Sequence, residues 1–134
     1  MNRFLLGLIG LLAITPAEAQ VPYWPLQAKA SGPINTSSSG LAQVVAAIPS
    51  KRVYLVNYAI MSAGTTTFEW EAGTGTNCGT NTTALSGLFA LTSTNPGLAI
   101  GSVGAQLITP PGYALCINLG SAVSVQGHFA YDQF

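Results

Sequence analysis

The acidic pair Glu69 and Glu71 has the spacing that could support acid–base chemistry. On a strand, side chains at i and i+2 point to the same side about 7 Å apart, which overlaps the separation of glycosidase acid pairs. The sequence supplies no accompanying base, nucleophile or metal ligand. Strand alternation also sets the pair opposite Phe68 and Trp70, on what we expect to be a solvent face. We therefore predict no catalysis at this pair.

The single histidine, His128, precedes Asp132 by four residues. On a strand this is about 13 Å, too far for the carboxylate to orient the imidazole, and no GxSxG motif presents a nucleophile. A zinc site needs at least three protein ligands, which one histidine and two oxidised cysteines do not supply. We expect a non-enzymatic protein with no catalytic residue, metal or cofactor, and a solvated His128.

A loop of small residues, GTGTNCGTNTT at positions 73–83, contains Cys78. Its glycines lack the GxGxxG spacing of a phosphate-binding loop, and it has no acidic residue for calcium. Cys116 is the second cysteine. An even cysteine count in an exported chain predicts one disulfide, Cys78–Cys116, which would hold the loop on its own domain. In a chain that stays in the cytoplasm, two free buried thiols are expected instead.

The first nineteen residues have the three parts of a secretory signal. Arg3 supplies a positive charge, residues 4–14 are apolar, and Ala17-Glu18-Ala19 is a small-x-small site before Gln20. The apolar run is shorter than the roughly 18 residues that a membrane span needs. We expect cleavage after Ala19 and export to the periplasm, the cell surface or the medium. The alternative is a retained apolar N-terminus, through which alone the chain would contact a membrane.

Charge is scarce: only 6% of the residues are charged, and the four basic and four acidic side chains cancel. Ordinary globular proteins have about 25%. A neutral surface gives little repulsion between molecules, which suits a protein packed against copies of itself or against partners. Three basic residues beyond the signal cannot neutralise a phosphate backbone, so nucleic acid is excluded as a partner.

The elements that position these residues are short runs with period two. Residues 20–40 are rich in proline and serine and are expected to form an extended arm. Strands are predicted at 41–48, 51–62, 65–72, 84–92, 98–103, 106–109, 113–119 and 122–131. The strands at 51–62 and 65–72 are expected to form a hairpin, with Phe68 and Trp70 in the core. About eight strands without a helix predict an all-β antiparallel sandwich in residues 41–134, of jelly-roll type.

Two blocks, KRVYLVNYAIMSAGTTTFEWEAGTGTNCGTNTTALSG from Lys51 and TPPGYALCINLGSAVSVQGHFAYDQF from Thr109, carry a resemblance. They resemble small β proteins of tailed phages, prophages and bacteria, in which a GTGTxCGTxTTxLxG loop, a TPxGxALC corner and a terminal VxGxxxYxQF recur. The blocks cover most of the chain after Lys51, and residues 20–40 carry no match. Because the group has no assigned activity, the resemblance implies a setting, a virion or cell-surface structural module, and no catalytic residue.

The sequence is therefore compatible with two functions. The first is a structural module of a virion or cell surface that decorates, cements or builds a fibre through self-association, as a homo-oligomer or lattice. Candidate charges for contacts across the predicted hairpin or between subunits are Lys51, Arg52, Glu69 and Glu71. The second is a secreted module that binds glycan or another cell-surface ligand. Candidate aromatic residues for an assembly or ligand surface are Tyr23, Trp24, Tyr54, Tyr58 and Tyr113.

Overall fold

The computed structural model describes residues 28–101 and 103–134. The predicted signal, most of the predicted arm, and Tyr23 and Trp24 lie outside the described residues. Strands make up most of the regular structure of the described chain, and the one helical element is a short 3₁₀ turn. Its elements are β1 (Ala30–Thr36), β2 (Gly40–Val45), β3 (Val53–Ser62), β4 (Thr66–Thr74), the 3₁₀ turn η1 (Thr76–Cys78), β5 (Thr80–Ala84), β6 (Phe89–Leu91), β7 (Gly97–Gly101), β8 (Leu107–Ile108), β9 (Ala114–Leu119) and β10 (Val125–Gln133).

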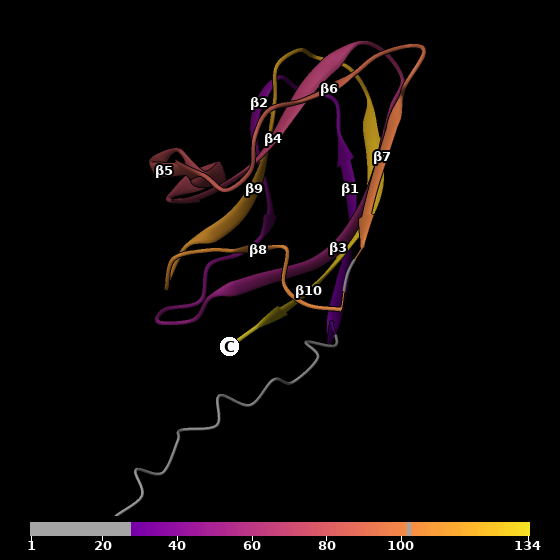
Figure 1. The fold of residues 1–134 in the computed structure, drawn as a ribbon. Coiled ribbons are helices and arrows are strands. Elements are labelled where there is room, and N and C mark those ends of the chain that lie inside the picture. The colour runs from indigo at the N-terminus through magenta and orange to yellow at the C-terminus, as the bar shows by residue number, and fades with distance from the viewer. Residues whose placement is uncertain (1–27, 102) are drawn as a thin grey trace, which may run out of the picture.

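Two antiparallel sheets pack face to face (Figure 1). Sheet A has the order β1-β10-β3-β7, with β8 also on β3, and sheet B has the order β2-β9-β4-β5, with β6 also on β4. If β5 and β6 are counted as one interrupted strand, and β7 and β8 as another, the orders become 1-8-3-6 and 2-7-4-5. This is the strand order of a jelly roll with eight strands. The predicted fold class is therefore confirmed.

The predicted hairpin between residues 51–62 and 65–72 is wrong. β3 lies in sheet A and β4 in sheet B, so the short connection between them crosses from one sheet to the other. Backbone hydrogen bonds direct this crossing: Ser62 N–H donates to the Pro96 carbonyl, and Ala63 N–H donates to the Ser124 carbonyl, each at 2.8 Å. Two amphipathic strands joined by a short turn have the same sequence pattern whether they pair with each other or face each other across a core.

The sandwich also begins earlier than predicted. β1 pairs with β10 along its whole length, from Ala30 opposite Tyr131 to Thr36 opposite Val125. Its Ile34 is buried in the core. The prediction that residues 30–40 belong to an extended arm is therefore wrong. β1 is an edge strand, where Pro33 is tolerated because the missing N–H faces away from the ladder, and so the proline did not prevent pairing.

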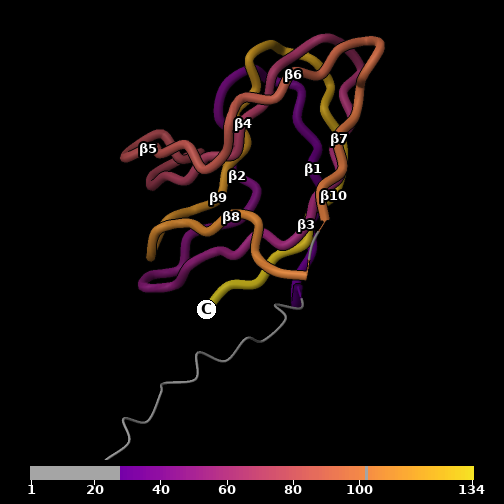
Figure 2. Tube along the Cα trace, in the orientation of Figure 1, coloured from indigo at the N-terminus to yellow at the C-terminus, as the bar shows by residue number. Residues whose placement is uncertain are grey.

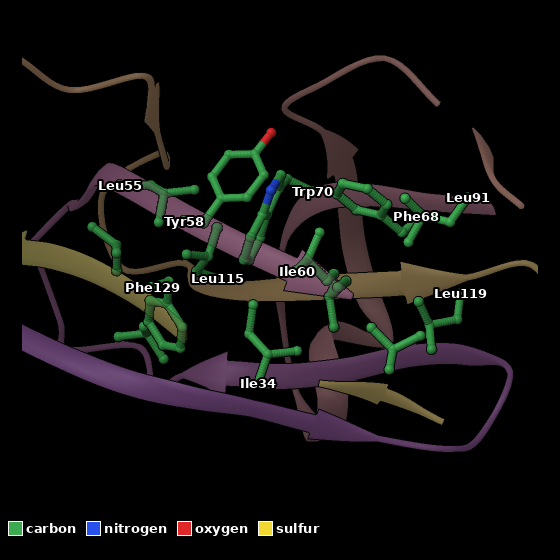
Figure 3. Packing of buried hydrophobic residues seen from close by; sticks show 14 residues of the cluster. Ile34, Leu55, Tyr58, Ile60, Phe68, Trp70, Leu91, Leu115, Leu119 and Phe129 are labelled. Carbon is green, nitrogen blue, oxygen red and sulfur yellow. The ribbon is translucent and has the colours of Figure 1, made fainter. Parts of the chain in front are cut away.

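The core lies between the sheets and is centred on aromatic side chains (Figure 3). Phe68 and Trp70 of β4 are fully buried, which confirms their predicted position. The Trp70 indole makes edge contacts with Tyr58 of β3 at 5.2 Å and with Phe129 of β10 at 6.3 Å between ring centroids. Burial of large rings from three strands of both sheets makes this cluster the main source of stability of the sandwich.

Candidate functional site

Tyr58, predicted as a surface residue for assembly or ligand binding, is instead a core residue. It is only 4% exposed and packs edge-on against Phe68 and Trp70. The cause is a bulge in β3: Ala130 pairs with Asn57 and Tyr131 with Leu55, so Val56 is an extra residue. The bulge reverses the alternation of the strand and turns Tyr58 inward. Burial raises the pKa of the Tyr58 phenol, and the neighbouring Trp70 indole N–H lowers it by a smaller amount.

Tyr54 does lie outside the core, on the outer face of sheet A. Its ring stacks on Phe134 with centroids 4.3 Å apart and an interplanar angle of 11°. Phe134 is 55% exposed, and its backbone pairs with Arg52 in both directions, at 2.9 and 3.3 Å. Ile108 of β8, 45% exposed, is the register neighbour of Tyr54 on β3. These residues form an apolar end patch, defined as Tyr54, Ile108 and Phe134, held in place by sheet hydrogen bonds.

Phe134 and Ile108 were not predicted as surface residues. The available signal for Phe134 was an aromatic residue that follows the last strand of the chain; its position beside the start of β3 is seen only in the structure. Tyr113 does not join the end patch: it is half-buried just before β9, and the structure records no ring contact between it and another aromatic residue of the described chain. Of the candidate aromatic residues that the structure describes, Tyr54 alone belongs to the end patch, where its ring stacks on Phe134.

Lys51 and Arg52 form a basic pair in the loop that joins β2 to β3. Both side chains are exposed, but their backbone is fixed: the Lys51 carbonyl accepts a bond from Gly112 N–H at 2.7 Å. The Arg52 guanidinium donates to the carbonyl of Thr109 at 3.3 Å. Thr109 is fully buried, and its hydroxyl accepts a bond from Val53 N–H at 2.9 Å. The loop therefore presents its two cations from a defined position at one end of the sandwich.

Glu69 and Glu71 form an acidic pair on the outer face of sheet B. The pair lies opposite Phe68 and Trp70 as predicted, but Glu71 is only 7% exposed, so the expected solvent face is largely covered at this residue. Glu71 pairs in register with Cys116 and Ala84 on its two neighbouring strands. Asn118 donates to its Oε1 atom at 2.6 Å. Strands on both sides, together with this amide, withdraw the carboxylate from water.

The predicted disulfide between Cys78 and Cys116 is present. Both cysteines are fully buried and form, with Ala114, a small second apolar cluster against which Leu41 packs. The bond attaches η1 to the outer side of β9, next to Gly73 of β4. A Cβ atom at Gly73 would lie 2.5 Å from the carbonyl oxygen of Cys78, so this close approach requires glycine. The glycine loop is thus attached to its own domain, and a buried disulfide indicates an oxidising compartment.

Beyond the disulfide, the chain projects sideways from the sandwich as β5 (Figure 2). All five residues of β5 are exposed on both faces, and the strand pairs only with β4. A register shift lies between Ala72 and Thr74 of β4, and Asn81 of β5 has a positive φ of 51°. Thr82 to Ala84 therefore form the regular part of the strand, with an open edge that faces away from β4.

Charged side chains are unevenly distributed along the described chain. In the described part of the chain, Lys29 and Asp132 form the one ion pair, at 3.5 Å. From Ala72 to Gly127 the sequence has no acidic or basic side chain. His128 is exposed on the outer face of sheet A, as predicted, and Asp132 is engaged by Lys29. A shallow pocket beside Met61 and Gln126 has no charged or aromatic residue in its lining.

Comparison with known proteins adds no family: no family model, no curated protein and no solved structure matches this chain. Within residues 28–101 and 103–134 there is no helix with the length and apolar character to cross a membrane. The same residues contain no group of three or more histidine, cysteine, aspartate or glutamate side chains placed to hold a metal ion. The function is therefore inferred from the geometry of the β5 edge, the end patch and the two charged pairs.

Proposed function

We propose that this protein is a non-enzymatic structural module of a virion or a cell surface that acts through self-association. The observation that carries this proposal is β5, a projecting and uncharged strand whose five residues are all exposed. An open strand edge presents unpaired backbone N–H and C=O groups and is a template for pairing with another chain. Soluble monomers commonly protect such edges with lysine or proline, and β5, with the sequence TNTTA, has neither.

The construction of the projection supports the same function. The ten residues 75–84 include a single buried side chain, so this segment has almost no apolar contact to keep it ordered. That side chain is Cys78, whose bond to Cys116 holds the base of the projection. The disulfide keeps the base of an exposed strand in a fixed position, as is expected of an element that binds a partner. The regular edge of β5 is short, so a stable contact needs further surfaces.

The setting follows from the disulfide and the resemblance together. The disulfide supports export to the periplasm, the cell surface or the medium, which agrees with the signal pattern of residues 1–19. The resemblance to phage and prophage β proteins supports a virion as the alternative setting. The jelly roll is compatible with either, since the fold is found in viral capsid proteins and in lectins and does not determine function.

The test is the molar mass in solution at micromolar concentration, by light scattering coupled to size-exclusion chromatography. An oligomer is expected, and Thr83→Lys, which places a charge on the β5 edge, should shift the equilibrium toward monomer. Thr65→Lys is the matched control, because Thr65 is also exposed but lies in the connection between β3 and β4. A wild-type chain that stays monomeric throughout this range would refute the proposal.

Glycan binding is the second candidate function, and the end patch is the observation that favours it. Exposed aromatic rings with a fixed orientation are suitable surfaces for the apolar faces of sugars. Arg52, whose backbone pairs with that of Phe134, has an exposed side chain with several N–H donors for hydroxyl groups. A glycan array tests this function. Binding that is lost in Phe134→Ser would support it, and an array without a hit would exclude it.

A further inference from the structure

The charged side chains that have no ionic partner within the chain fall into two groups of opposite sign. The Lys29–Asp132 pair accounts for one cation and one anion. In the described part of the chain, the remaining cations are the basic pair, Lys51 and Arg52, and the remaining anions are the acidic pair. The two groups contain equal numbers of charges. No ion pair joins them within one molecule, because β3 and β4 lie in different sheets.

The basic pair is built as a contact surface. Its loop is fixed by bonds from Gly112 N–H to the Lys51 carbonyl and from Arg52 N–H to the Phe134 carbonyl, at 2.7 and 2.9 Å. Exposed apolar residues flank it: Ile48 is 41% exposed and Phe134 is 55% exposed. A rigid loop that carries two exposed cations next to apolar side chains has the composition of a protein interface, in which charges supply orientation and apolar atoms supply affinity.

The acidic pair lacks a compensating cation. Glu71 is 7% exposed, and its one recorded hydrogen bond comes from the neutral amide of Asn118. A carboxylate withdrawn from water is costly unless a cation or several donors compensate it. The neighbouring outer-face residues of β2 and β9, including Gln43 and Asn118, carry no charge. Among the described residues, sheet B therefore offers two carboxylates on a face without a cation.

We propose that the basic pair of one copy docks on the acidic pair of a second copy. This inference rests on the proposed self-association and specifies the surfaces that meet. The charge complementarity is quantitative, since two cations face two anions and each copy stays neutral. The acidic pair also lies on β4 beside β5, because Glu71 pairs in register with Ala84. A copy docked there would contact the β5 edge as well, which supplies the additional surface that the short edge requires.

Complementary charge reversal tests the docking. Lys51→Glu and Glu69→Lys are the variants of choice, since neither side chain makes an ion pair or a recorded side-chain hydrogen bond within the described residues. Each variant alone should raise the dissociation constant of the oligomer at least about tenfold, because like charges then meet at the contact. An equimolar mixture of the two should associate with an affinity close to that of the wild-type chain, because glutamate at position 51 then faces lysine at position 69.

The controls separate this docking from a general effect of charge. Lys51→Gln should weaken association. Lys29→Gln changes the net charge by the same amount but should leave association unchanged, since Lys29 is paired with Asp132. Association of the wild-type chain should weaken in about 1 M NaCl, where the screening length is only about 3 Å. Thermal melts of each variant confirm that it is folded.

The outcomes distinguish the docking from the function on which it rests. A wild-type chain that is monomeric overturns both. A wild-type oligomer that Lys51→Glu and Glu69→Lys leave intact, or single variants that dissociate but do not recover on mixing, overturn the docking alone and leave self-association through β5 standing.

Discussion

Replacing both cysteines by alanine should destabilise the sandwich and release its projection. The bond between Cys78 and Cys116 closes a loop with a sequence separation of 38. In the chain-entropy relation, a loop of this length corresponds to a loss of about 4 kcal/mol in the free energy of unfolding. For a domain of about 100 residues, each kcal/mol lowers the melting temperature by about 4 °C, so the melting temperature should fall by about 15 °C.

The loss should be uneven within the molecule. The main core of Phe68, Trp70 and Phe129 lies between the sheets and makes no use of the bond. The residues of η1 and β5 depend on it, because Cys78 is the one buried side chain in the segment 75–84. In Cys78→Ala/Cys116→Ala, amide hydrogen exchange should therefore accelerate most in 76–84, while the central strands β3, β9 and β10 keep slow exchange relative to that segment.

Urea unfolding and hydrogen exchange together check this prediction. Thr83→Ala is the control, since this exposed side chain of β5 has no recorded hydrogen bond and the variant should stay within about 0.5 kcal/mol of wild type. A loss of less than about 1 kcal/mol in the double variant, or exchange in 76–84 as slow as in the wild-type chain, would show that the disulfide does not order the projection.

Three further predictions concern single positions. Gly73→Ala should lower the free energy of unfolding in urea by about 1–3 kcal/mol, because its Cβ would collide with the backbone of Cys78. Gly87→Ala, where the structure leaves open space, should leave this free energy unchanged. Thr109→Val should lower the free energy of unfolding by a similar amount, because Val53 N–H then lacks the hydroxyl that accepts its hydrogen bond. Thr109→Ser keeps that hydroxyl and should retain most of the wild-type stability. Tyr58 has a raised pKa, so the unfolded state loses this proton first and stability should fall as pH rises above about 10. Alkaline melts should show this slope, and Tyr58→Phe should reduce it.

The fold class could be predicted from the sequence because every strand that faces a core leaves the same signal, alternation of apolar and polar residues. Phe68 and Trp70 were placed correctly on this basis. Alternation says which face of a strand is buried and does not say which strand lies beside it. The pairing of β3 with β10 and the crossing between β3 and β4 depend on contacts between distant segments, so the predicted hairpin was wrong.

Features of the candidate site were harder to predict for local reasons. One extra residue, Val56, reverses the alternation of β3, and a bulge of this kind leaves no signal in a strand that is apolar on both faces. It turned Tyr58 from a predicted surface residue into a core residue. β1 was missed because serine, glycine and proline mask its single buried residue, Ile34. The disulfide, in contrast, needed only the cysteine count and an export signal.

The most direct test of the central claim is the molar mass of the native chain in solution, measured by sedimentation velocity over a series of micromolar concentrations. Self-association predicts a mass that is a multiple of the chain mass at the upper end of the series and that falls on dilution. A single species with the mass of one chain at every concentration would contradict the account, and the end patch would then remain as the basis for a ligand-binding function.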